Sequence, residues 1–284
     1  MPIGSVDPKP GDVAVAPVVA SRPLAAVRGR LEPAIWFAAP FVVLIIAWTA
    51  AVRAYDVPLR VFPAPADVAA ALAQQWRTGA IAGHVTASLT RVIVGGSLAI
   101  AASIPLGIAI STNRAVAAFF TPLLRFFAVL AGIAWIPLAT LWFGYGFGAI
   151  TFIIFNAVFF IVVYNTILGV TQIPPMLINA AYSLGANRWH VLTEVLLPGA
   201  LPNIVTGIRT GMGFAWRGLI AAEIIATNAG LGYMVFLARD FYRTEVIVLG
   251  MIVIGAIWVA IDRLILAPIE RRTIERWGLA RRAV

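Results

Sequence analysis

The stretch AITFIIFNAVFFIVVYNTILGV, residues 149–170, contains no charged side chain. A helix needs about 20 mostly apolar residues to cross the hydrocarbon core of a bilayer, so this stretch is long enough to do so. Five further stretches have a similar length and polarity: about 34–52, 86–110, 119–143, 204–226 and 246–266. The chain is therefore predicted to be an all-α integral membrane bundle of about six transmembrane helices.

The composition agrees with a membrane protein and excludes a water-soluble one. Hydrophobic residues make up 61% of the chain and charged residues 12%, whereas soluble domains average about 45–50% and about 25%. The net charge of +9 could indicate nucleic-acid binding. The arginines, however, occupy short segments between apolar runs, a distribution that sets the orientation of a membrane protein. We therefore expect a lipid bilayer, and no nucleic acid, as a partner.

The sequence shows no catalytic, metal-binding or nucleotide-binding motif. Cysteine is absent and the only lysine is Lys9, so the chain has no Gly-Lys-Ser/Thr of a phosphate-binding loop. His84 and His190 have no second ligand at metal spacing, and Glu223 is the only acid well inside a predicted span. We expect a chain that is not an enzyme and binds neither metal nor cofactor. Any ATP that drives it must be bound by another chain.

The arginine distribution predicts the orientation and the boundaries. With the N-terminus inside, the inner segments hold 13 basic residues: Lys9, Arg22, Arg28, Arg30, Arg114, Arg125, Arg188, Arg263, Arg271, Arg272, Arg276, Arg281 and Arg282. The outer segments hold five: Arg53, Arg60, Arg77, Arg239 and Arg243. Because inner loops carry the excess, both termini are predicted to be cytoplasmic.

This orientation defines three regions. They are a disordered N-terminal tail (1–33), a transmembrane domain (34–266) with a long inner loop at about 171–203, and a basic C-terminal tail (267–284) that anchors at anionic lipid. An outer amphipathic helix, with Val68, Leu72 and Trp76 on one face, is expected between Ala66 and Trp76. Prolines inside the spans (Pro105, Pro122 and Pro137) are expected to kink the helices without breaking them.

Four charged residues fall within or at the edge of predicted spans, where burial costs roughly 2.5–3.5 kcal/mol on insertion scales. Arg217, beside Trp216, has planar donors that suit a small anion. A structural ion pair, for example with Glu223, is the competing interpretation. Arg91 is expected to extend to the outer surface, and Arg209 to meet lipid phosphate or the inner loop.

The candidate substrate pathway follows from these residues and from other polar or bulky side chains inside the spans. Asn156, with Tyr164 and Asn165, could line a wet cavity or form hydrogen bonds between helices. Small residues four apart (Ala128/Gly132, Ser103/Gly107 and Gly207/Gly211) predict close helix packing in the bundle, or less directly a dimer interface. The candidate pathway residues are Arg217, Trp216, Glu223, Asn156, Trp135 and Arg91.

The inner loop contains a spaced motif. Ala180, Ala181 and Gly185 are followed after nine residues by Val-Leu-Leu-Pro, which ends in Leu197 and Pro198. This pattern resembles the Glu-Ala-Ala, three residues, Gly, nine residues, Ile-x-Leu-Pro loop of the permease subunits of ABC importers. Asn179 replaces the glutamate and Val195 the isoleucine.

The resemblance implies the type I ABC importer permease fold and assigns a role to the loop. Asn179 to about His190 would be a coupling helix that docks on an ATPase subunit, with Gly185 freeing the backbone to turn. The loop residues concerned are Asn179, Ala180, Ala181, Gly185, Ala186, Leu197 and Pro198. The family assembles two permease copies, two ATPases that use ATP and magnesium, and a soluble binding protein.

Further stretches resemble the sulfonate, taurine and nitrate branch of this family. They include Phe62-Pro63-Ala64-Pro65, Ile136-Pro137-Leu138 and Gly230-Leu231-Gly232-Tyr233. Two departures lie near the implied pathway, because Ala131 stands where the family often has proline and Trp135 is bulkier than the usual aliphatic residue.

The resemblance implies import of a small anion into the cytoplasm of a bacterium by alternating access across the inner membrane. The substrate would be an aliphatic sulfonate, taurine or a nitrate-like ion, or alternatively an aromatic acid or vitamin precursor. An ion-coupled secondary transporter and a membrane-embedded enzyme are the more distant alternatives.

Overall fold

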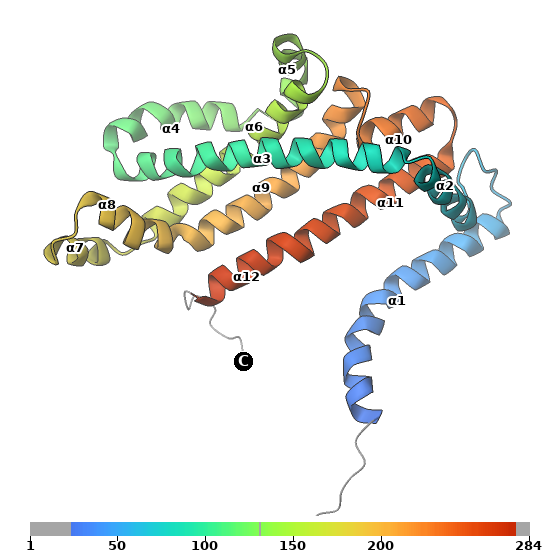
Figure 1. Cartoon of the computed structure of the whole chain (residues 1–284), viewed down its shortest axis with the longest axis horizontal. Coiled ribbons are helices and arrows are strands. Elements are labelled where there is room, and N and C mark those ends of the chain that lie inside the picture. Colours follow the sequence, from blue (N-terminus) through green and yellow to red (C-terminus); the bar gives the residue numbers. More distant parts are fainter. Residues whose placement is uncertain (1–23, 131, 277–284) are drawn as a thin grey trace, which may run out of the picture. The chain divides into compact units, whose positions relative to one another are not determined.

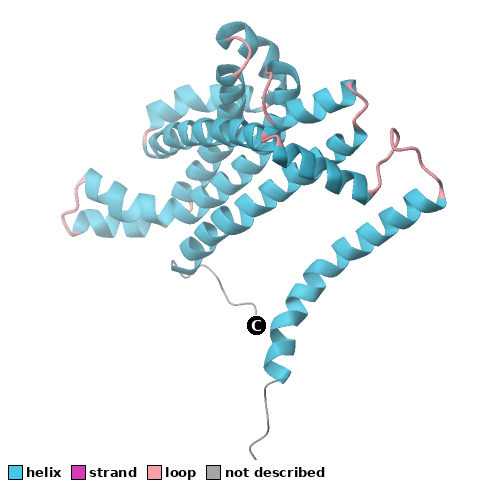
Figure 2. Ribbon diagram, turned by 45° about the vertical axis from the view of Figure 1, so that its right-hand side comes forward, coloured by secondary structure: helices cyan, strands magenta, loops and turns pink. Residues whose placement is uncertain are grey.

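The computed structural model describes residues 24–130 and 132–276, and within these ranges the chain consists of helices and loops without any strand (Figures 1 and 2). The long helices are α1 (Leu24–Ala54), α3 (Ala80–Thr112), α6 (Phe147–Thr171), α9 (Leu197–Ala226) and α11 (Thr244–Ile261). The shorter ones are α2 (Pro65–Arg77), α4 (Arg114–Ala128), α5 (Ile136–Phe143), α7 (Pro175–Ser183), α8 (Arg188–His190), α10 (Leu231–Asp240) and α12 (Ala267–Arg276). A 3₁₀ segment, η1 (Gly132–Trp135), and two π-helical segments, η2 (Val191–Leu196) and η3 (Asp262–Leu266), complete the fold.

Four continuous helical stretches among the described residues are long and apolar enough to cross a membrane: 80–112, 147–171, 188–226 and 244–273. They confirm the predicted spans at 86–110, 149–170, 204–226 and 246–266. The stretches 188–226 and 244–273 extend beyond their predicted spans because these helices continue into segments with charged residues, which hydropathy excludes.

The predicted span at 119–143 is wrong as a single helix. α4 ends at Ala128, and the chain then turns by 93° into η1 and α5, so that this pair forms either a broken span or a re-entrant loop. Pro105 and Pro122 lie inside unbroken helices, but Pro137 stands in the first turn of α5. The break lies between Ala128 and Gly132, and Ile136 is already helical, so Pro137 stands after the break at a first-turn position where proline is tolerated.

The chain divides into two units, residues 1–51 and 52–284, and each is considered by itself. In the first unit, α1 begins at Leu24, so residues 24–33 of the predicted tail are helical and not disordered. The apolar part of α1 within the described side chains, Ala39–Ala54, is shorter than a full span. The span at 34–52 therefore stays a prediction. The remainder of the predicted tail, residues 1–23, lies outside the described residues.

α6 is the centre of the second unit. It packs against α3 on one side and α9 on another, with α5 and η1 beside its first turns (Figure 1). Its side chains are apolar around the whole helix, which is the pattern of a helix surrounded by others. Ile150, Ile153, Ile154, Val158 and Val162 are fully buried.

Small residues allow this close packing. A Cβ atom at Gly207 of α9 would lie 2.5 Å from the Cβ atom of Asn165 of α6. In α3, Ser103 donates a hydrogen bond to the Phe159 carbonyl of α6. Two of the predicted small-residue pairs thus serve packing inside the bundle, as small residues do in membrane helices. The third pair, Ala128 and Gly132, spans the break between α4 and η1.

Both π-helical segments end two residues before a proline: η2 before Pro198 and η3 before Pro268. Proline cannot donate the i→i−4 hydrogen bond and its ring collides with that carbonyl. A local π-helical turn adjusts the ladder without ending the helix. The two long helices therefore continue through their prolines.

The predicted amphipathic helix is confirmed as α2, whose first turn is capped by Asp67 accepting from the Ala64 amide at 2.9 Å. It packs against α3 and α11. Val68 and Ala71 form its buried side, while Leu72 and Trp76 are exposed. The buried face is thus only partly the one expected.

Candidate functional site

The inner loop, residues 171–203, contains two short helices joined by a glycine turn. α7 ends at Ser183, and Gly185 follows with φ +86°. The amide of Gly185 donates to the Tyr182 carbonyl and that of Ala186 to the Ala181 carbonyl, both at 3.0 Å. This pair of bonds is a Schellman C-cap. The expected single helix from Asn179 to His190 is therefore interrupted at Gly185.

One side of this loop is anchored on the bundle. Ala181 and Ala186 pack against a buried apolar cluster drawn from the end of α6, η2 and the start of α9, which consists of Val170, Ile173, Val191, Leu196, Ala200 and Ile204. The other side is exposed and also apolar, with Leu184 88% and Trp189 67% exposed. Asn179 and Ala180 are exposed beside them. An exposed apolar surface on a loop is typical of a protein-binding site.

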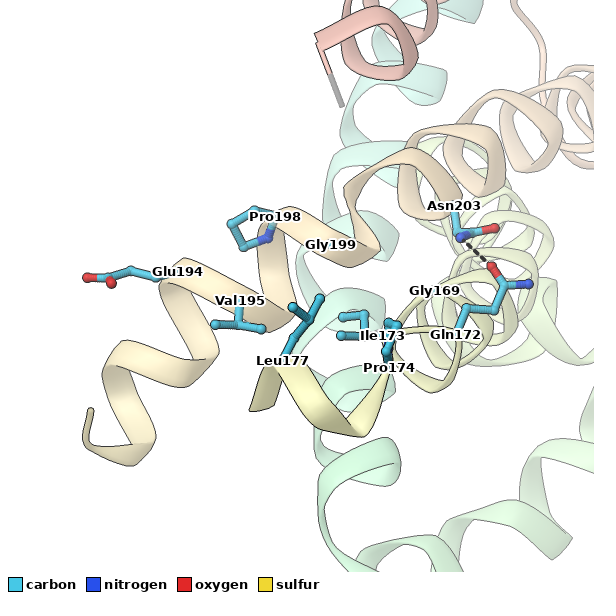
Figure 3. Close-up of a pocket in the computed structure, with 10 residues that line it drawn as sticks. All are labelled: Gly169, Gln172, Ile173, Pro174, Leu177, Glu194, Val195, Pro198, Gly199 and Asn203. Carbon is cyan, nitrogen blue, oxygen red and sulfur yellow. Dashed lines mark hydrogen bonds between the residues drawn. The ribbon is translucent and has the colours of Figure 1, made fainter. Parts of the chain in front are cut away.

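A cavity of about 550 Å³ lies between this loop and the bundle (Figure 3). It is lined from α6, α7, η2 and α9, and Pro198, Leu177 and Ile173 supply much of its apolar wall. Asn203 donates to the Gln172 side chain at 3.1 Å, which ties α9 to the end of α6. Leu197 and Pro198 of the motif thus lie where the loop joins α9.

A second cavity, of about 420 Å³, lies where α4, η1, α6 and α9 meet. Arg217 and Asn156 are its polar residues, and Phe160 and Phe214 supply aromatic rings. The Arg217 guanidinium lies 5.6 Å from the centre of the Phe214 ring, within cation–π range. No carboxylate among the described residues lies within ion-pair distance of Arg217, and Glu223 pairs with Arg91 instead, so the competing interpretation of a structural ion pair is wrong.

The two tryptophans of the candidate pathway do not line this cavity. Trp216 is buried and stacks on Trp258 of α11, with ring centres 6.3 Å apart. Trp135 packs between Phe127 and Phe152. Neither indole nitrogen has a hydrogen-bond partner among the described residues. Both rings thus pack against aromatic neighbours and are not among the residues that line the cavity.

Arg91 and Glu223 form a buried ion pair away from the cavities, with Nη1 and Oε1 2.6 Å apart and side-chain exposures of 7% and 0%. The expectation that Arg91 extends to the surface is therefore wrong. Its guanidinium also donates to the Ala229 carbonyl and to Thr227. A buried charge needs such partners because leaving it unpaired costs several kcal/mol.

Sequence reasoning missed the other groups that hold this carboxylate. Ser88 donates to both Glu223 oxygens, at 2.7 and 2.9 Å, and the Gly232 amide donates at 2.9 Å. His84 accepts from the Gly230 amide at 3.1 Å. Ser88 lies three residues before Arg91, on the same face of the helix. This spacing could have indicated that the two side chains share a partner.

Arg209 is paired with two acids from one neighbouring helical stretch, which are not the partners expected for it. Its Nε and Nη2 donate to Asp262 at 2.7 and 2.8 Å, and its Nη1 donates to Glu270. A small cavity of about 340 Å³ separates this network from Arg217. Asp262 and Glu270 are eight residues apart, a helical repeat that could have revealed their common face.

These features define a class: a helical membrane subunit with a cavity beside the exposed Arg217, where α4, η1, α6 and α9 meet, and with an exposed apolar loop. Residues 99–272 match the family described as binding-protein-dependent transport system inner membrane component. The chain belongs to this family. It is thus an ABC importer permease of the inner membrane, a transport component and not an enzyme.

The individual relatives that the chain matches are also permease proteins of transport systems. The chain is 41% identical over 187 residues to an ABC transporter permease protein of Methanocaldococcus jannaschii, covering 66% of this chain and 70% of the relative. It is 37% identical over 221 residues to the taurine transport system permease protein of Escherichia coli, covering 76% and 80%. It is 37% identical over 194 residues to the bicarbonate transport system permease protein of Synechococcus elongatus, covering 68% of each.

A solved structure confirms the fold. A chain of the MetNI methionine ABC transporter, in inward-facing conformations, superposes with a TM-score of 0.51 at 20% identity, covering 66% of this chain and 95% of that one. The type I importer permease fold predicted from the inner-loop motif is therefore confirmed.

Proposed function

We propose that this permease passes a small organic or inorganic anion, an aliphatic sulfonate, taurine or a nitrate-like ion, from a soluble binding protein to the cytoplasm by alternating access. The observation that carries the proposal is the cavity around Arg217. This guanidinium has no carboxylate partner among the described residues, although a charge inside a membrane normally needs one. A transported anion supplies the missing charge.

The rest of the cavity suits such a substrate. Asn156, which is buried, adds an amide that both donates and accepts. A volume of about 420 Å³ holds a small anion with room for some of its water. Relatives named for taurine and bicarbonate transport support an anion as the cargo.

A second candidate substrate is an aromatic carboxylate. Phe160 and Phe214 line the same cavity as Arg217. Flat rings prefer offset or edge-to-face contact with such side chains, so an aromatic acid would place its carboxylate on the arginine and its ring on the phenylalanines.

The proposed assembly has two permease copies, two ATPase subunits that use ATP and magnesium, and one binding protein. Both termini lie in the cytoplasm, as the excess of inner arginines favours. The exposed apolar side of the inner loop, with Leu184 and Trp189, would dock on the ATPase. Closure of the ATPases would move these loops and open the bundle outward.

The test is substrate-stimulated ATP hydrolysis by the complex reconstituted in liposomes with its ATPase and binding protein. The panel contains alkanesulfonates, taurine, nitrate, bicarbonate, aromatic carboxylates and a thiamin precursor. Wild type is compared with Arg217→Ala, Arg217→Lys and the control Arg125→Ala, which removes an exposed arginine of α4.

One anion should stimulate wild type and Arg125→Ala alike. Arg217→Ala should lose the stimulation while still assembling, and Arg217→Lys should keep part of it because the charge remains but the planar donors do not. Stimulation that survives in Arg217→Ala would return Arg217 to a structural role, and stimulation by a neutral compound alone would exclude the anion.

A further inference from the structure

The end of the last long helix contains a basic hollow that the transport mechanism does not use. A cavity of about 770 Å³ lies where η3 and α12 face α9. Its residues are Arg209, Asp262, Arg263, Ala267, Pro268, Arg271 and Arg272. Four arginines thus surround this cavity, and the small side chains of Ala267 and Pro268 leave its volume unfilled.

The charges around this hollow do not balance. Asp262 and Glu270 hold Arg209 through three hydrogen bonds, and Asp262 also interacts electrostatically with Arg263. Arg271 and Arg272 are exposed, and among the side chains that the structure describes, those of residues 39–130 and 132–273, no carboxylate lies within ion-pair distance of either. Among these described side chains, four arginines against two acids leave a surplus of two positive charges, carried by Arg271 and Arg272.

The hollow lies at the boundary between apolar and polar chain. Charged residues reappear at Asp262, directly after the apolar α11. Leu264 is 76% exposed, and Ile265 and Ile269 are about half exposed in the same turns. One short segment therefore offers both apolar side chains and guanidinium groups, the combination found at the headgroup level of a bilayer.

We propose that this hollow binds the phosphate group of an anionic phospholipid. Arg271 and Arg272 donate to the phosphate oxygens, for which planar guanidinium groups are well shaped. The acyl chains lie along Leu264 and Ile265. Basic clusters beside a membrane helix attract anionic lipid in this way. Free phosphate offers the same oxygens but makes no use of the apolar side chains.

The experiment measures lipid binding to the full complex in detergent by native mass spectrometry. The probes are phosphatidylglycerol, phosphatidylcholine and inorganic phosphate. The test variant is Arg271→Ala/Arg272→Ala. The control is Arg114→Ala/Arg125→Ala, which removes two exposed arginines of α4 and so changes the net charge equally.

Phosphatidylglycerol should bind wild type and the control more tightly than phosphatidylcholine does. The test variant should lose about 30-fold in affinity for phosphatidylglycerol, the loss expected for two arginines near an anionic surface. Arg271→Lys/Arg272→Lys should retain most of it. If the alanine variant does not assemble, Arg271→Gln alone should give a loss of about 5-fold.

Equal binding by the test variant and the control would overturn the site. Inorganic phosphate that binds with the same dependence on Arg271 and Arg272, and displaces phosphatidylglycerol at millimolar concentration, would keep a phosphate site but overturn the lipid as its occupant.

Discussion

Oε1 of Glu223 in α9 accepts a hydrogen bond from Nη1 of Arg91 in α3, and the two atoms are 2.6 Å apart. The two residues are separated by 132 positions in the chain. The same carboxylate accepts from Ser88 and from the Gly232 amide. One buried group therefore joins α3, α9 and the start of α10. It occupies a place that is separate from the cavity around Arg217.

Removing one member of this pair should destabilise the protein strongly. Arg91→Met or Glu223→Leu leaves the other charge buried without its partner, and such losses cost about 3–5 kcal/mol. The double variant should lose much less than the sum of the two. Thermal unfolding of the purified permease in detergent measures all three. Additive losses would show that the two side chains do not stabilise each other.

Glycine contacts between α6 and α9 should tolerate no added methyl group. Gly207→Ala would place its Cβ 2.5 Å from Asn165, and overpacking of this kind costs about 1–3 kcal/mol. Gly255 of α11 has no atom within 4 Å of an added Cβ. Gly255→Ala should therefore be neutral or stabilising, because alanine is the better helix former by about 0.5–1 kcal/mol. A lower unfolding temperature for Gly207→Ala and an unchanged or higher one for Gly255→Ala would confirm the close approach of α6 and α9. Equal unfolding temperatures in the two variants would contradict it.

Truncation of the exposed apolar side of the inner loop should weaken ATPase binding. Leu184→Ala and Trp189→Ala are each expected to reduce the affinity about 30-fold, which corresponds to a hot-spot loss of about 2 kcal/mol. Leu141→Ala, a control at another strongly exposed leucine, should bind normally. Affinity is measured by titrating the ATPase into labelled permease. Normal binding by both loop variants would place the docking surface elsewhere.

Lysine should not be able to replace Arg209 in its bidentate contact with Asp262. Arg209→Lys keeps the charge but cannot form both parallel hydrogen bonds, and we expect a loss of about 1 kcal/mol for these partly exposed groups. Arg239→Lys is the matched control, because its contact with Asp240 is mostly exposed and should contribute nothing measurable. An equal loss of unfolding free energy in both variants would show that the bidentate hydrogen bonds of Arg209 make no special contribution.

Most of the fold could be predicted because hydropathy and helix length report directly on membrane spans. The stretches around 149–170 and 204–226 coincide with long helices. The break before Pro137 could not be predicted from proline alone, because Pro105 and Pro122 remain inside helices. Whether a proline ends a helix depends on whether neighbouring groups satisfy the backbone it frees, and a single sequence does not report those neighbours.

The candidate site was predicted less completely. Arg217 and Asn156 do share a cavity, as their positions in the spans suggested. The partners of the other charges depend on which helices pack together. Arg91 could be matched with Glu223, and Arg209 with Asp262, only after the contacts of α9 with α3 and α12 were known.

The distance along the chain between Arg91 and Glu223 also has a consequence for biosynthesis. A ribosome adds about 5–20 residues per second, so roughly 7–26 s pass between the synthesis of the arginine and that of its glutamate. If α3 enters the membrane during this time, its arginine is a lone charge, at a cost of roughly 2.5–3.5 kcal/mol. An arginine in this state extends toward the headgroups. We therefore expect the nascent chain to hold Arg91 near the surface until α9 is inserted and Glu223 becomes available to it.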